Sequence, residues 1–120
     1  MYPDESPEVV KLPDDEEGIH FGLFDNNQLI GVASWFRRSE TEAQFRKFAT
    51  LEQFRNLGYG THLMKYIINF SKMEGIKVLW CNARVDAVNF YKRLGFLETD
   101  QRFTKNRIEY LIIKCDLQSV

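Results

Sequence analysis

The residues best suited to chemistry form a short glycine-rich segment, Arg55-Asn56-Leu57-Gly58-Tyr59-Gly60-Thr61. A helix is predicted to follow it, and the first N–H groups of a helix have no intrahelical partner and lie at its positive end. Glycines let the backbone turn sharply, so that a phosphate can approach those N–H groups closely. Arg55 adds a fixed positive charge, and Thr61 adds a hydroxyl donor. The segment therefore predicts a pyrophosphate site, although the same spacing also occurs in a simple tight turn.

Two nucleotide-binding motifs do not fit this segment. No Gly-Lys-Ser/Thr ending is present, which argues against a nucleotide P-loop. Position 63 is Leu, which argues against the Gly-x-Gly-x-x-Gly dinucleotide fingerprint. These two known alternatives are therefore excluded by the sequence.

A second segment, residues 82–96, reads Asn-Ala-Arg-Val-Asp-Ala-Val-Asn-Phe-Tyr-Lys-Arg-Leu-Gly-Phe. Helical spacing predicts an inner face of Ala87, Phe90, Tyr91 and Leu94. Tyr91 is therefore a core aromatic or a proton donor, since a phenol with an unperturbed pKa near ~10 is protonated at neutral pH. The residues alone leave both roles open.

The hydrophobic pattern predicts the elements that must position these segments. Strands are expected at 19–24, 29–36, 43–50 and 76–82, helices at about 61–74 and after Asp86, which can cap the second helix, and a closing antiparallel pair at 96–103 and 107–116. Turn residues follow the first strand, and glycines follow both helices. The order β-β-β-α-β-α-β-β predicts an α+β domain with a mixed, mainly antiparallel sheet at residues 19–120.

The two segments together resemble the GNAT acetyltransferases. The stretch from Arg55 to Gly60 is similar to their motif A, Arg/Gln-x-x-Gly-x-Gly/Ala. Their motif B ends in Ala-x-x-Phe-Tyr-x-x-x-Gly-Phe, matched by Ala87, Phe90, Tyr91, Gly95 and Phe96. The resemblance covers about residues 19–116. The strand ends Phe48-Ala-Thr50 and Asn82-Ala-Arg look most like the small bacterial ElaA-type branch.

The resemblance implies a GNAT fold whose sheet splays apart around acetyl-CoA. It implies direct transfer of the acetyl group to a primary amine of a small molecule or peptide, without a metal. The implied cofactor-binding residues are Phe48, Ala49, Thr50, Arg55, Asn56, Leu57, Gly58, Tyr59, Gly60, Thr61, Asn82, Arg84 and Asn89. Tyr91 is implied as the general acid for the leaving thiolate, and a backbone N–H at the end of the strand that closes with Thr50 as the oxyanion donor.

The sequence departs from the family pattern in three places. Arg84 stands where many relatives have Asn, and it could contact a CoA phosphate, the acceptor or only solvent. No general base is evident: Lys47 stands where a glutamate might be sought, and the candidates by chemistry or position are Glu40, Glu42, Glu52, His20 and His62. The N-terminal strand and helices of the family are expected to be shortened, which leaves the acceptor pocket open or completed by another subunit.

Composition is that of an ordinary globular protein, with 44% hydrophobic and 28% charged residues among 120. Residues 1–17 hold seven of the 17 acidic side chains and one of the 16 basic ones, so the remainder carries +5. Residues 1–18 are predicted to be an extended or irregular acidic arm. Cys81 and Cys115 match no metal spacing and are expected to be reduced, buried thiols of a cytoplasmic protein.

Three function classes remain open from the sequence. The leading one is an acetyl-CoA-dependent enzyme that works as a monomer or homodimer. The second is an acyl-CoA-binding module without turnover. The third, a nucleic-acid binder, would use the basic body, but no basic run or known motif supports it. No apolar run approaches the ~18 residues of a membrane span, so no membrane partner is expected.

Overall fold

The computed structural model describes residues 7–12 and 18–117, and the rest of the predicted acidic arm lies outside these residues. The strands are β1 (Glu8–Lys11), β2 (Ile19–Asp25), β3 (Gln28–Arg37), β4 (Glu42–Thr50), β5 (Val78–Arg84), β6 (Leu97–Lys105) and β7 (Ile108–Asp116). The helices are α1 (Tyr59–Met73) and α2 (Val88–Lys92), and the 3-10 turns are η1 (Glu52–Phe54) and η2 (Val85–Ala87).

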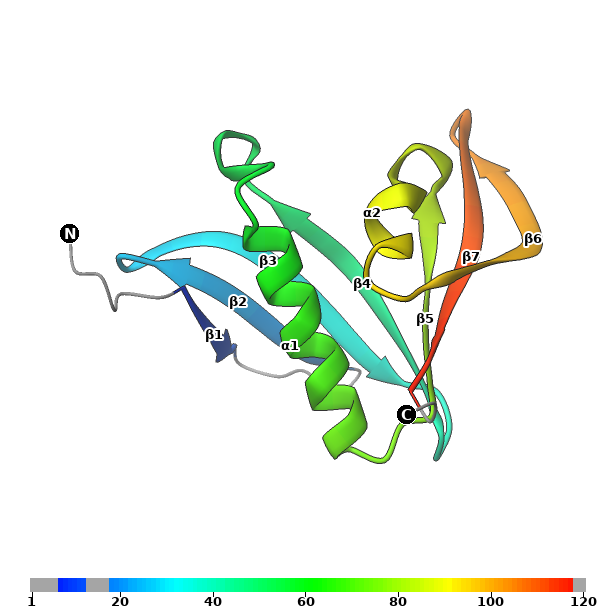
Figure 1. The fold of residues 1–120 in the computed structure, drawn as a ribbon, viewed down its shortest axis with the longest axis horizontal. Helices are drawn as coiled ribbons and strands as arrows, with labels where there is room; N and C mark the ends of the chain where they lie inside the picture. The colour runs from blue at the N-terminus through cyan, green and yellow to red at the C-terminus, as the bar shows by residue number, and fades with distance from the viewer. Residues whose placement is uncertain (1–6, 13–17, 118–120) are drawn as a thin grey trace.

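The described strands form one sheet in the order β1-β2-β3-β4-β5-β7-β6. Only β4 and β5 pair in parallel, and every other pair is antiparallel. The helices α1 and α2 lie in front of the sheet in Figure 1, with α1 crossing β2 to β4 and α2 beside β5. The prediction of a mixed, mainly antiparallel sheet flanked by helices is confirmed.

The core lies between α1 and the sheet. Leu63, Met64 and Ile67 of the helix are fully buried, as the helical spacing predicts. Ser71 is also fully buried, but its hydroxyl donates to the Ile67 carbonyl and accepts from the Trp35 indole N–H at 2.9 Å, so no polar atom is left unsatisfied there. The helix is thereby fixed in register over β3.

Three local predictions differ in detail from the structure. Residues 8–11, in the arm predicted to be extended or irregular, are extended and form β1, which pairs with β2 and adds a strand to the sheet. The fifth strand runs two residues later than expected, so Arg84 rather than Asn82 ends it. Asp86 caps no helix: it lies inside η2 and pairs with Arg84 at 3.5 Å. The four residues of β1, with two valines, are too short a pattern to identify a strand. Asp86 does not cap a helix because the nearby Arg84 guanidinium competes for its carboxylate.

In the part of the chain that the structure describes, no helix is long and apolar enough to cross a membrane. Cys81 and Cys115 are both buried and unpaired with each other, as expected.

Candidate active site

The site begins where β4 and β5 separate. Their parallel pairing covers only Glu42, Ala43 and Gln44 of β4, against Val78, Leu79 and Trp80 of β5. Beyond Gln44 the two strands diverge, as Figure 1 shows. The β5-facing N–H and C=O groups of residues 45–50 therefore have no strand partner, and an exposed strand edge of this kind can pair with an extended ligand.

A bulge in β4 contributes to this separation. The register between β3 and β4 shifts between Val32 and Ser34, where Arg46 is the partner of Ser34 and Ala49 the partner of Val32. Lys47 lies in this shift and adopts a φ of +56°. A bulged strand bends and twists away from its neighbour, so the bulge directs the rest of β4 away from β5.

Aromatic side chains fill the base of the opening. The Phe45 ring lies 5.8 Å from that of Tyr91 and 5.7 Å from that of Phe96, between centroids. Further out, Phe48 stacks on Phe90 at 5.8 Å. These large rings prevent β4 and β5 from pairing further along their length, and they hold α2 against β4.

The opening is a cleft of about 890 Å³, a size suited to a small-molecule ligand. It is lined by Phe45, Arg46, Lys47, Phe48, Ala49, Thr50, Arg55, Asn56, Gly58, Gly60, Thr61, Cys81, Asn82, Ala83, Arg84, Asp86, Ala87, Phe90, Tyr91 and Arg93. Five of these side chains are basic and one is acidic, which favours an anionic ligand.

The structure brings most of the predicted site residues to this cleft. Those that line it are Phe48, Ala49, Thr50, Arg55, Asn56, Gly58, Gly60, Thr61, Asn82, Arg84 and Tyr91. Three others lie elsewhere: Leu57 is 65% exposed, Asn89 is exposed on α2, and the Tyr59 hydroxyl donates to the Asp25 carboxylate. Leu57 lies in the turn before α1 and Tyr59 begins α1, and neither side chain lines the cleft.

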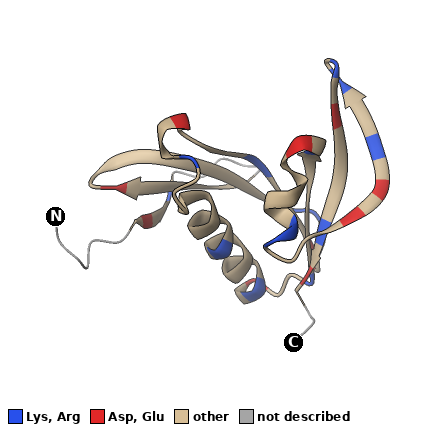
Figure 2. Ribbon diagram, turned by 45° about the horizontal axis from the view of Figure 1, so that its top comes forward, with Lys and Arg blue, Asp and Glu red and all other residues tan. Residues whose placement is uncertain are grey.

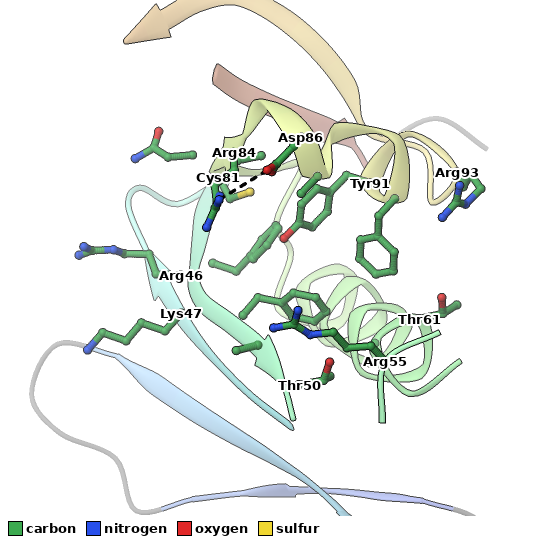
Figure 3. A pocket seen from close by; sticks show the side chains of 18 of the residues that line it. Arg46, Lys47, Thr50, Arg55, Thr61, Cys81, Arg84, Asp86, Tyr91 and Arg93 are labelled. Carbon is green, nitrogen blue, oxygen red and sulfur yellow. Dashed lines mark hydrogen bonds and ion pairs between the residues drawn. The ribbon is translucent and has the colours of Figure 1, made fainter. Parts of the chain in front are cut away.

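One end of the cleft lies at the start of α1. Asn56 and Gly58 both have positive φ, +64° and +90°, and they turn the chain into the start of α1. The first turn of α1 holds no acidic side chain, and its N-cap makes no side-chain hydrogen bond. The N–H groups there are open to an anion, with Arg55 and Thr61 beside them in Figure 3.

Tyr91 projects into the cleft from α2, as Figure 3 shows. Its side chain is largely buried, and its hydroxyl makes no hydrogen bond with another described residue. Burial, with a smaller effect of Cys81, raises the pKa of the phenol well above its usual value. The hydroxyl is therefore a neutral donor directed at whatever occupies the cleft.

Sequence reasoning did not assign Cys81, Asp86 or Arg93 to the cleft, nor the bulge residues Arg46 and Lys47. Strand alternation could have placed Arg46 on the face opposite Phe45, but a bulge leaves no reliable sequence signal. Burial raises the pKa of the Cys81 thiol, so this cysteine is a neutral side chain rather than a nucleophile.

Neither histidine lines the cleft. His20 is joined to Ser34 at 2.8 Å, and His62 is exposed on α1. Glu40, Glu42 and Glu52 also lie outside it, so Asp86 is the one carboxylate among the lining residues. Among residues 7–12 and 18–117, no group of three or more His, Cys, Asp or Glu side chains is arranged to hold a metal ion.

Comparisons with known proteins point to one family. The sequence model described as "Acetyltransferase (GNAT) family" matches residues 1–96. The chain is 34% identical over 111 residues to "Uncharacterized N-acetyltransferase YitI" of Bacillus subtilis, covering 86% of this chain and 74% of that protein. An uncharacterized acetyltransferase of Streptococcus pyogenes is 23% identical over 83 residues, which are 69% of this chain and 58% of that protein.

Solved structures share the fold. A GNAT family acetyltransferase from Elizabethkingia anophelis with acetyl-CoA bound superposes with a TM-score of 0.74 at 20% identity, over 83% of this chain and 76% of that one. The ribosomal-protein-S18-alanine N-acetyltransferase from Escherichia coli gives 0.77 at 22% identity, over 89% and 74%. The family match, the Bacillus relative and the cleft agree, and the chain belongs to the GNAT acetyltransferase family.

Proposed function

We propose that the protein is an N-acetyltransferase that moves the acetyl group of acetyl-CoA directly to a primary amine. The observation that carries the proposal is the meeting, in one cleft, of an unpaired strand edge, an open helix N-terminus and the Tyr91 hydroxyl. Each of these matches one part of the thioester cosubstrate. If β4 and β5 paired along their full lengths, the strand edge would be occupied and the space between the strands would be closed.

Acetyl-CoA fits the cleft in one direction. Its pyrophosphate would bind the N–H groups at the start of α1, with Arg55 as counter-charge. Its pantetheine amides would pair with the free edge of β4 at residues 48–50, as an added strand does. The thioester then lies between β4 and β5, next to Tyr91.

The chemistry follows from that placement. The neutral amine nitrogen attacks the thioester carbon, and a backbone N–H near the end of β4 stabilises the resulting oxyanion. As the C–S bond breaks, Tyr91 gives its proton to the departing sulfur. The nitrogen loses a proton through water, and the phenolate regains one, which its raised pKa favours. The products are the acetylated amine and free CoA.

A dedicated general base is not part of the proposal. Asp86 is exposed and ion-paired with Arg84, and no other carboxylate or imidazole lines the cleft. An acceptor that arrives as the free amine needs no base before the attack. The rate should therefore rise with pH as the amine deprotonates, in the range set by the pKa of the acceptor.

The test compares wild type with Tyr91→Phe. Release of CoA is measured with a set of primary amines, the acetylated product is identified by mass spectrometry, and binding of acetyl-CoA is measured by calorimetry. The expected result is a fall in kcat of about 100-fold with an unchanged Kd, in line with the loss of one proton donor. An acyl-CoA-binding protein without turnover would bind acetyl-CoA but release no CoA with any amine, and that result would reject the enzyme.

A further inference from the structure

The cleft has a second basic end that the cofactor phosphates do not need. Arg46 and Lys47 line it from β4, whereas Arg55 and Thr61 line it from the start of α1. Figure 3 shows the two pairs on opposite sides of the opening, with Tyr91 on a third side. A pyrophosphate held at the α1 end leaves the β4 pair without a partner.

Strand geometry explains why these two charges gather there. Phe45 packs against Tyr91 and Phe96 on the helix side of the sheet, so the next side chain, Arg46, points to the other face. Phe48 returns to the helix side, where it stacks on Phe90. Two residues therefore lie between two helix-facing phenylalanines, and the bulge at Lys47 accommodates the extra one. In Figure 3 both basic side chains extend in the same direction, away from the helices.

Within residues 7–12 and 18–117, neither side chain has an acidic partner. Both side chains are exposed, and no ion pair joins Arg46 or Lys47 to another described residue. On the β5 side of the same opening, Arg84 has Asp86 at 3.5 Å. Among the described residues that line this side of the cleft, three are basic (Arg46, Lys47 and Arg84) and one is acidic (Asp86). This excess of positive charge disfavours polyamines and other cationic acceptors.

We propose that the acceptor is a small primary amine that also carries a carboxylate or phosphate group, and that Arg46 and Lys47 bind that anionic group. This proposal rests on the proposed acetyl transfer. The guanidinium of Arg46 offers a planar fork for a carboxylate or phosphate, and Lys47 adds a point charge. With its anion held on β4, the amine reaches the thioester between β4 and β5 from the side opposite the CoA phosphates.

The experiment measures acceptor binding without relying on turnover. Protein saturated with CoA is titrated by calorimetry with matched probes: β-alanine against β-alaninamide, and O-phosphoethanolamine against ethanolamine. Each pair differs only in the anionic group, and the two pairs separate carboxylate from phosphate. We expect at least one anionic probe to bind about tenfold more tightly than its neutral partner, an effect of the size of one charged hydrogen-bonded contact, and to lose that advantage at high salt.

Variants assign the preference to the two residues. Arg46→Gln/Lys47→Gln should remove the tenfold preference and leave the Kd for acetyl-CoA within about twofold of wild type. Lys105→Gln removes a charge from the exposed β6–β7 hairpin, whose tip is basic (Figure 2), and it should change neither. Thermal unfolding of both variants verifies that they fold.

Three results would overturn the proposal: no anionic probe binds at millimolar concentration, the neutral probes bind as tightly, or the double variant keeps the preference. Failure of the underlying acetyl transfer is distinguishable from these. It would be seen first, as an absence of acetyl-CoA binding or of CoA release, whereas failure of this inference leaves acetyl-CoA binding intact.

Discussion

The two halves of β4 both pair with β3, but they differ on the side that faces β5. Residues 42–44 pair with β5, and residues 45–50 do not. The first half completes the sheet, and the second half leaves its backbone groups for a ligand. The comparison shows that the cleft is formed by interrupting a parallel strand pair. The rings around Phe45 and a one-residue bulge in β4 keep the two strands apart.

The largest effect should come from truncating Phe45, the central ring between β4 and α2. Phe45 is 1% exposed and contacts the rings of Phe48, Tyr91 and Phe96. Phe45→Ala should lower the free energy of unfolding by about 3–5 kcal/mol, because it leaves a cavity at which three neighbouring rings lose their contacts. Denaturant titration measures the change.

Phe103→Ala is the matched control for this change. Phe103 stacks on Tyr110 in the β6–β7 hairpin and is 39% exposed, so its truncation should cost about 1 kcal/mol or less. If both variants lose the same free energy of unfolding, the Phe45 ring is not a major contact between β4 and α2.

A middle-sized effect should appear at the phosphate end. Arg55→Gln should weaken acetyl-CoA binding by about tenfold and reduce its salt dependence, because one charged contact to the pyrophosphate is lost. The measurement is calorimetry at two salt concentrations. Equal affinities of wild type and variant would remove Arg55 from the phosphate site.

The smallest effect concerns the bulge itself. Lys47 has a φ of +56°, a conformation that costs a side chain with a Cβ about 1 kcal/mol. Lys47→Gly should therefore be more stable than Lys47→Ala by about 1 kcal/mol, the reverse of the usual order in a strand. Denaturant titration of the two variants compares them directly, and an alanine variant at least as stable would mean that the bulge is not formed in solution.

Most of the elements and the turn before α1 could be predicted from the sequence, because both depend on local patterns. Leu63, Met64 and Ile67 repeat at helical spacing, and Gly58 marks the turn before α1. Motif resemblance brought Tyr91 into the site. The parts that the sequence could not predict depend on contacts between distant residues: the bulge at Lys47, the ion pair of Asp86 with Arg84, and the basic face around Arg46.

β1 escaped prediction for a related reason. Val9 and Val10 are too few to mark a strand, and their pairing with β2 and the packing of Val9 against the core are not visible in the local pattern. The ElaA-type branch likewise stays a prediction, since the comparisons show the superfamily and not that branch.

The most direct test of the account is calorimetric titration of acetyl-CoA into wild type, Gly58→Glu and Gly75→Glu. Both glycines have positive φ, +90° and +80°, and a Cβ at either would meet open space, so the two variants carry the same backbone strain at opposite ends of α1. Only Gly58→Glu places a negative charge and bulk in the proposed phosphate site. The account predicts one equivalent bound by wild type and by Gly75→Glu, and no binding by Gly58→Glu. Absence of binding by wild type, or equal binding by Gly58→Glu, would contradict it.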